Sequence, residues 1–139
     1  MRSDAFRAAV ENWDRAAIEA ALAPDVVFRS PAVFRPYEGR EATMTVLEAV
    51  SNVFEDFRYL ENPFERADDR GAAGGGEVLH FAARVGDREL DGIDMLRFDR
   101  EGRVRELTVM VRPFSGLSAL LEAMGRELER LGVPVPGGG

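Results

Sequence analysis

The sequence has no cysteine and no lysine among its 139 residues, and only one histidine. Without cysteine there are no disulfide bonds, no thiolate nucleophile and no cysteine-ligated zinc, as is usual for a cytoplasmic protein. His80 alone cannot assemble a histidine-based metal site. We therefore expect no metal, no cofactor and a cytoplasmic location.

Long apolar runs and an excess of positive charge are missing too. No window approaches the ~18 uninterrupted apolar residues that a membrane span needs. The first 13 residues carry charges where a signal peptide would need an apolar run. The net charge of −7 disfavours a nucleic-acid-binding surface, because such surfaces present basic groups to phosphates. We expect neither a nucleic acid nor a membrane as a partner.

What is present is typical of a globular domain. Hydrophobic residues make up 45% of the chain and charged residues 31%, which is ordinary for a protein that buries a core. There is no repeat and no linker that would separate two domains. We expect a single domain over residues 1–132, followed by a flexible tail over residues 133–139.

Apolar residues recur at helical spacing in three places. Near the N-terminus they predict an amphipathic helix that begins at Ser3 or Asp4, with Asp14 capping a second short segment through Leu22. Similar spacing predicts helices over 40–54 and 117–131. The apolar stripe of the first helix consists of Phe6, Val10, Trp13 and Ala17.

Short strands fill most of the remaining chain and predict an α+β fold. Strands joined by very short turns must be antiparallel neighbours. The predicted strands are 26–29, 57–64, 78–85, 89–98 and 104–112, and the predicted loops are 30–39 and 68–76, the latter a glycine-rich hairpin tip.

The turn Gly86-Asp87 sets the register of the central hairpin. Glycine at the first position of a two-residue loop favours a type II′ turn, which places Leu79 opposite Asp94. Charged side chains then sort to one face and apolar ones to the other, with Asp94 as the exception. A three-residue loop would instead place His80 opposite Asp94 as a candidate dyad. In the favoured register the apolar face holds Leu79, Phe81, Ala83, Leu90, Gly92, Leu96, Phe98 and Asp94.

Asp94 is the candidate catalytic residue. A carboxylate on an apolar face is costly unless it is paired, hydrogen-bonded or protonated, and desolvation raises its pKa toward the range of a general acid or base. The alternatives are an aspartate at the wet mouth of a pocket, or one held by a backbone amide or an arginine.

Three segments carry a family resemblance: residues 24–28 (Pro-Asp-Val-Val-Phe), Glu38-Gly39-Arg40, and the hairpin 92–104 with Gly-Ile-Asp-Met-Leu-Arg-Phe-Asp. Together they resemble the nuclear transport factor 2-like superfamily, and its SnoaL-like branch most. The resemblance spans about residues 6–114. It implies a curved antiparallel sheet that the N-terminal helices wrap into a cone with an apolar pocket, plus a C-terminal helix. Because this superfamily contains isomerases, hydrolases, cyclases and non-catalytic domains, the fold does not decide the function.

Residue by residue, the catalytic resemblance is partial. Ketosteroid isomerases have a tyrosine on the first helix, a protonated aspartate on the hairpin and an aspartate base after the first strand. The matching positions hold Phe6, Asp94 and Ser30. The site of limonene epoxide hydrolases is absent, since Phe28, Ser30 and Val109 occupy its positions. SnoaL-type cyclases use a carboxylate in a deep apolar cavity, which Asp94 can supply.

The resemblance implies three functions. One is an isomerase- or cyclase-like enzyme that uses Asp94 on a small apolar molecule; another is a non-catalytic binder of such a molecule. The third is an interaction module whose exposed sheet face and C-terminal helix form a homodimer or dock another protein. The implied ligand-binding residues are Phe6, Trp13, Phe28, Ser30, Tyr37, Leu47, Val50, Leu79, Phe81, Leu107 and Val109.

Overall fold

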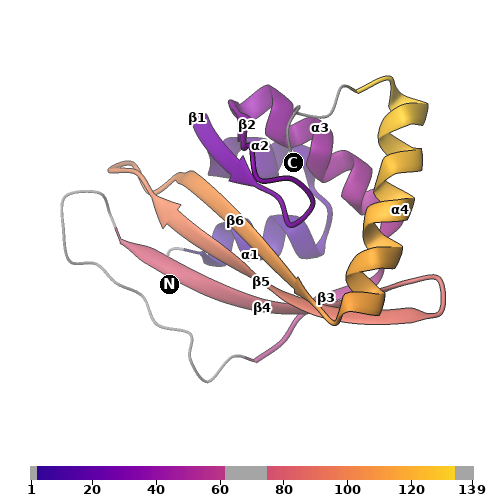
Figure 1. Ribbon diagram of the computed structural model, residues 1–139. Coiled ribbons are helices and arrows are strands. Elements are labelled where there is room, and N and C mark those ends of the chain that lie inside the picture. Colours follow the sequence, from indigo (N-terminus) through magenta and orange to yellow (C-terminus); the bar gives the residue numbers. More distant parts are fainter. Residues whose placement is uncertain (1–2, 62–74, 134–139) are drawn as a thin grey trace.

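A six-stranded sheet is covered on one face by four helices in the computed structural model, which describes residues 3–61 and 75–133 (Figure 1). Its strand order is β2-β1-β6-β5-β4-β3. The elements are α1 (Asp4–Glu11), α2 (Arg15–Ala21), β1 (Leu22–Arg29), β2 (Tyr37–Glu38), α3 (Arg40–Val53), β3 (Glu55–Tyr59), β4 (Gly76–Val85), β5 (Arg88–Phe98), β6 (Val104–Arg112) and α4 (Phe114–Leu131).

The α+β fold class is confirmed, with one refinement to the sheet. All strand pairs are antiparallel except β1 with β6, which is parallel. A parallel pair needs a long crossover connection, and here α3 and the strands β3 to β5 supply it. The sheet is therefore mixed, although its three longest strands form the predicted antiparallel meander.

The predicted hairpin register is confirmed. Leu79 pairs with Asp94, and Gly86 has the positive φ of 60° that the two-residue turn requires. His80 pairs with Ile93 and lies on the opposite face from Asp94, so the alternative His80–Asp94 dyad is wrong.

The first helix is shorter than its apolar stripe suggested. α1 ends at Glu11, and Trp13 has a positive φ of 46° that turns the chain into α2. The predicted cap is present, because the Asp14 carboxylate accepts a hydrogen bond from the Ala17 amide at 3.1 Å. The stripe is thus split between two helices.

Several boundaries differ from the sequence prediction. β1 begins at Leu22 and includes Pro24, which is tolerated because the ladder to β6 is irregular between Leu22 and Val27. The two-residue strand β2 interrupts the expected loop 30–39, and α4 begins at Phe114. β3 begins at Glu55 and ends at Tyr59. Residues 62–74 and 134–139, with most of the predicted glycine-rich loop and tail, lie outside the described residues.

The helices bury the apolar face of the sheet. Figure 1 shows α3 and α4 on the same side of the long strands, with α4 rising from the end of β6. Among the described residues, no helix is long and apolar enough to cross a membrane.

Candidate functional site

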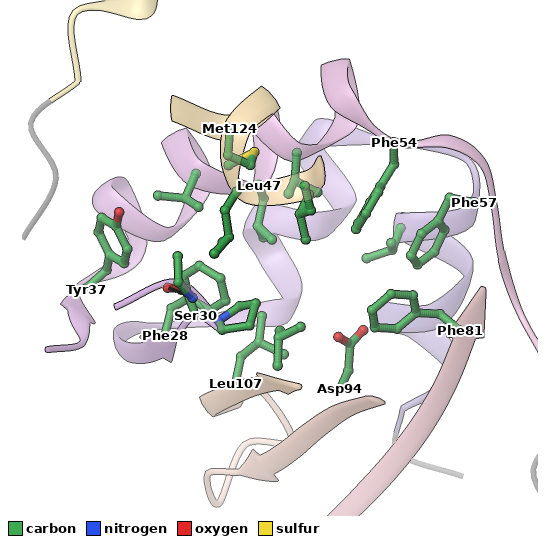
Figure 2. A pocket seen from close by; sticks show the side chains of 18 of the residues that line it. Phe28, Ser30, Tyr37, Leu47, Phe54, Phe57, Phe81, Asp94, Leu107 and Met124 are labelled. Atoms are coloured by element: carbon green, nitrogen blue, oxygen red, sulfur yellow. Dashed lines mark hydrogen bonds between the residues drawn. The ribbon is translucent and has the colours of Figure 1, made fainter. Parts of the chain in front are cut away.

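A cavity of about 210 Å³ lies between the inner face of the sheet and the helices. Residues from all six strands line it together with residues from α1, α3 and α4 (Figure 2). Apart from Ser30, Tyr37, Tyr59 and Asp94, its side chains are apolar. Two of its lining residues, Ala32 and Gly125, are exposed, and the others are buried or half-buried.

Most residues proposed from the sequence do line this cavity. Those that do are Phe6, Phe28, Ser30, Tyr37, Leu47, Val50, Phe81, Asp94, Leu107 and Val109. Their part in binding or catalysis stays a prediction.

Two proposed residues, Trp13 and Leu79, do not line it. Trp13 follows the end of α1 in a left-handed conformation and packs, half-buried, against the core. Leu79 points to the inner face but is sealed in the core, with 2% of its surface exposed. A position on the correct face of an element is therefore not enough to place a side chain at the cavity.

Asp94 has apolar surroundings on its own strand and on both neighbours. Its cross-strand partners are Leu79 on β4 and Val109 on β6. Gly92 and Leu96 flank it on the inner face of β5. Only 8% of Asp94 is exposed, and Figure 2 shows its carboxylate directed into the cavity from the sheet.

Gly92 allows an aromatic wall to form beside this carboxylate. It pairs with Phe81, and a β-carbon at position 92 would lie 2.7 Å from the Phe81 ring and overlap the Met110 carbonyl oxygen. Any side chain would collide with both. The missing side chain thus lets the Phe81 ring lie across β5 next to Asp94.

Tyr59 is the hydrogen-bond partner of Asp94, and sequence reasoning missed it. Its hydroxyl donates to the Asp94 carboxylate over 2.7 Å. Tyr59 lies on β3 opposite Phe81, which brings it to the inner face. Among the described residues, no second side chain or amide is hydrogen-bonded to the Asp94 carboxylate.

Burial and this hydrogen bond have opposite effects on Asp94. Desolvation raises the pKa of Asp94 from 3.8 to about 7, while the Tyr59 hydrogen bond acts to lower it. Burial also raises the pKa of Tyr59 well above its ordinary value, and the nearby Asp94 raises it further. Tyr59 therefore stays protonated as a donor, while Asp94 exchanges its proton near neutral pH.

Side chains from α1 and β3 hold Tyr59 in place. Its amide donates to the Glu11 carboxylate at 3.3 Å, and the Arg7 guanidinium lies 5.7 Å from its ring centroid. The Phe57 ring packs edge-on against the Tyr59 ring, with the two ring centroids 5.1 Å apart. Such fixed partners orient the phenol toward Asp94.

The other polar groups lie at the far side of the cavity. Figure 2 shows Ser30 and Tyr37 beside Phe28, away from Asp94. The Ser30 hydroxyl oxygen accepts hydrogen bonds from the amides of Ala32 at 3.2 Å and Val33 at 3.4 Å, which leaves its proton to donate. Tyr37 stacks on Phe28 at 5.8 Å, and burial raises its pKa.

A second buried carboxylate, Glu77, has a different environment. Both of its oxygens accept from the Ser3 amide at the start of α1, at 3.3 and 3.2 Å, and it does not line the cavity. Within residues 3–61 and 75–133, no cluster of three or more histidine, aspartate or glutamate side chains suited to a metal ion is present. Asp94 is therefore the acid that faces the cavity.

Sequence reasoning also missed the upper wall of the cavity. Phe54 and Phe57 come from the junction between α3 and β3, and Pro31 and Ala32 from the loop after β1. The amphipathic helix predicted over 117–131 was a usable signal, because its apolar face supplies one side of the site. The residues of α4 that line the cavity are Leu120, Leu121, Met124, Gly125 and Leu128.

Comparison with known proteins gives a consistent result. The family model described as a SnoaL-like domain matches residues 4–107. A solved structure described as a steroid delta-isomerase from Pseudomonas aeruginosa is 44% identical, with a TM-score of 0.80 over 91% of this chain and 88% of that one. An uncharacterised protein with a cystatin-like fold from Silicibacter pomeroyi is 28% identical, with a TM-score of 0.79 over 92% and 85%.

More distant similarity extends to the wider fold. A protein described as NTF2-like from Burkholderia xenovorans is 19% identical, with a TM-score of 0.60 over 91% of this chain and 92% of that one, and it shows the fold alone. No curated protein matches the sequence.

Proposed function

Because this chain belongs to the SnoaL-like domain family, which has the nuclear transport factor 2-like fold, we propose that its cavity is the active site of a small-molecule isomerase. Asp94 carries a proton from one carbon of an apolar, uncharged carbonyl compound to another. The observation that carries this proposal is a single buried carboxylate, directed into an apolar cavity, with a pKa of about 7. An acid with a pKa near the working pH is an effective proton carrier.

The relatives support an isomerase. The 44% identical protein from Pseudomonas aeruginosa is described as a steroid delta-isomerase. Such a reaction moves a carbon–carbon double bond into conjugation with a carbonyl group and needs only a proton carrier. Asp94 has the position and acidity for that role.

The reaction requires no further reagent. Ionised Asp94 takes a proton from the carbon between the carbonyl and the double bond, and the electrons of that C–H bond form an enolate. Protonated Asp94 then returns the proton at the far end of the former double bond. Substrate and product have the same atoms, and Asp94 ends in its starting state.

Tyr59 assists both half-reactions. Its hydrogen bond orients the Asp94 carboxylate and favours the ionised form. Once Asp94 holds the proton, this hydrogen bond weakens, because a neutral acid is a poorer acceptor. The phenol is then available to donate to the enolate oxygen, where negative charge has developed.

A direct assay tests this function. The β,γ-unsaturated ketone 4-isopropylcyclohex-3-en-1-one becomes a conjugated enone on isomerisation, which ultraviolet absorbance follows. We expect turnover by the native protein and its loss in Asp94→Asn. The aspartate on the opposite face of β5 offers a matched control, Asp91→Asn, which should retain turnover. Equal rates in Asp94→Asn and the native protein would refute the proposed role of Asp94.

One observation favours a second function, binding without reaction. Ser30 stands where the resemblance places a base, and the cavity contains no carboxylate other than Asp94 among the residues described as lining it. A binding protein would bind the unreactive ketone 4-isopropylcyclohexanone but leave the unsaturated ketone unchanged. The same two compounds therefore distinguish the two functions.

We also propose that two copies associate through the outer face of the sheet. Met95 and Met110 are 39% and 53% exposed there, next to the charged cluster of His80, Asp91 and Arg112. A mixed apolar and charged surface of this kind is typical of protein interfaces.

A further inference from the structure

The cavity also limits the size of the substrate, an inference that rests on the proposed function. We propose that it accepts an uncharged carbonyl compound built on a single ring, or an acyclic chain of similar bulk, and excludes skeletons of several fused rings. The substrate would thus be smaller than the steroid named in the description of the 44% identical relative.

The volume of the cavity limits the size of the ligand. At about 210 Å³ it exceeds the roughly 150 Å³ of an apolar cavity that binds benzene. It is smaller than the ~300–1,000 Å³ typical of pockets for drug-sized ligands. One ring with a short apolar substituent fits this space, whereas four fused rings do not.

Packed aromatic rings close the Asp94 end. Phe57 lies against Phe81 with ring centroids 5.3 Å apart, and against Phe54 at 5.7 Å. Figure 2 shows these three rings together at one side of the cavity. Rings in mutual contact do not separate without losing those contacts, so this end does not lengthen for a larger ligand.

A second stack closes the opposite end. Phe28 and Tyr37 are 5.8 Å apart and only 4% and 8% exposed. Pairs of packed aromatic rings therefore bound the cavity at both ends. A longer ligand would have to separate one of these ring pairs.

The lining also determines the charge of the ligand. None of the described side chains around the cavity is basic, so a carboxylate or phosphate would be buried without a partner. A cation would lie in an apolar chamber with one acid of raised pKa. The hydroxyl groups of Tyr59 and Ser30 suit neutral oxygen atoms.

Three ketones of increasing size test the inference. They are 4-isopropylcyclohex-3-en-1-one, a two-ring β,γ-unsaturated ketone and a four-ring β,γ-unsaturated 3-ketosteroid. We expect kcat/KM to fall at least tenfold from one ring to four. Calorimetry with the unreactive 4-isopropylcyclohexanone and a saturated 3-ketosteroid measures binding separately, and one-to-one binding of the one-ring ketone alone is expected.

Substitutions at Leu47, a half-buried side chain of α3 that points into the cavity, change its size (Figure 2). We expect Leu47→Phe to weaken binding of the one-ring ketone at least tenfold by occupying its space. Leu47→Ala should improve acceptance of the two-ring ketone relative to the one-ring ketone, and Leu47→Val is the milder variant if the alanine protein does not fold. Circular dichroism checks the fold of each variant.

The outcomes separate this inference from the proposed function. If the four-ring ketone is isomerised as efficiently as the one-ring ketone, the size limit is overturned and the isomerase stands. If the one-ring ketone binds, Leu47→Phe prevents that binding and no ketone reacts, the size limit stands and the isomerase fails. If the one-ring ketone does not bind, the size limit is overturned.

Discussion

Asp91 and Asp94 lie three positions apart on β5, yet they have opposite acid–base properties. Asp91 points to the outer face, where it accepts hydrogen bonds from His80 at 2.7 Å and Arg112 at 2.8 Å. These partners lower its pKa, the His80 hydrogen bond most of all. Asp94 points inward, has Tyr59 as its partner and has a pKa raised to about 7 by burial.

The difference shows that the face of a strand, rather than the residue type, determines the chemistry of each acid. An odd spacing along a strand places two side chains on opposite faces. One face offers cations and water, and the other offers leucine, valine and phenylalanine. Asp91 is therefore ionised at neutral pH, while Asp94 can exchange a proton there.

The largest expected effect is on catalysis. Asp94→Asn keeps the shape of the side chain but removes its proton-carrying group, so the rate of ketone isomerisation should fall about 10²- to 10⁴-fold. Asp91→Asn should change the rate by less than threefold. Steady-state kinetics at pH 7 on both variants measures the comparison, and equal losses would remove the distinction between the two faces.

The second effect is on stability as a function of pH. The folded-state pKa of Asp94, about 7, is above the ordinary value of 3.8. As the pH rises from 3.8, the unfolded chain releases this proton first. The folded protein therefore loses stability at about 1.4 kcal/mol per pH unit, up to about 4 kcal/mol by pH 7.

Urea denaturation between pH 4 and 8 measures this loss. We expect Asp94→Asn to show a smaller decrease than the native protein over that range. Asp91 acts in the other direction, because its lowered pKa gives a contribution that is present above its unfolded pKa and lost as the pH falls. Parallel curves for the native protein and Asp94→Asn would show that Asp94 is not buried as described.

A third, smaller effect concerns the hydrogen bond that Tyr59 donates. In Tyr59→Phe the ionised form of Asp94 loses its donor, so the pKa of Asp94 should rise further, by about one to two units. The basic form is then scarcer at pH 7, and the enolate oxygen loses its donor as well, so the rate should fall at least tenfold there and recover only in part at higher pH. The pH–rate profile measures the shift, and Tyr37→Phe should leave the position of its acidic limb unchanged.

The last prediction concerns the outer face of the sheet, where association of two copies would double the mass of the particle in solution. If two copies pair there, light scattering at micromolar concentration should report about twice the 15.4 kDa of the chain. Met110→Glu places a charge among the exposed methionines and should restore the monomer mass. A monomer mass for the native protein would exclude the homodimer.

The sequence predicted the central hairpin because its information is local. Gly86-Asp87 determines the turn, and strict alternation then places Asp94 on the apolar face. The same logic failed for Trp13, since a local change to positive φ breaks the helix that its spacing implied.

Tyr59 could not be identified as a site residue from the sequence, for a different reason. β3 ends at Tyr59 and β4 begins at Gly76, too far apart along the chain for a two-residue turn to set their register. The alternation of Tyr59 with Phe57 places both side chains on one face of β3. It does not indicate which strand lies next to β3. The contribution of α4 to the cavity was missed similarly, because an apolar stripe does not specify where its helix packs.

The titration of Asp94 in the folded protein tests the central claim most directly. Carbon-detected NMR follows the side-chain carboxyl carbons of Asp91 and Asp94 in one sample, and Asp94→Asn and Asp91→Asn assign the two signals. We expect the Asp94 signal to titrate with a midpoint of about 7 and the Asp91 signal to titrate below 3.8. A midpoint for Asp94 at or below 3.8 would contradict the account, because such an acid would be fully ionised and unable to return a proton at neutral pH.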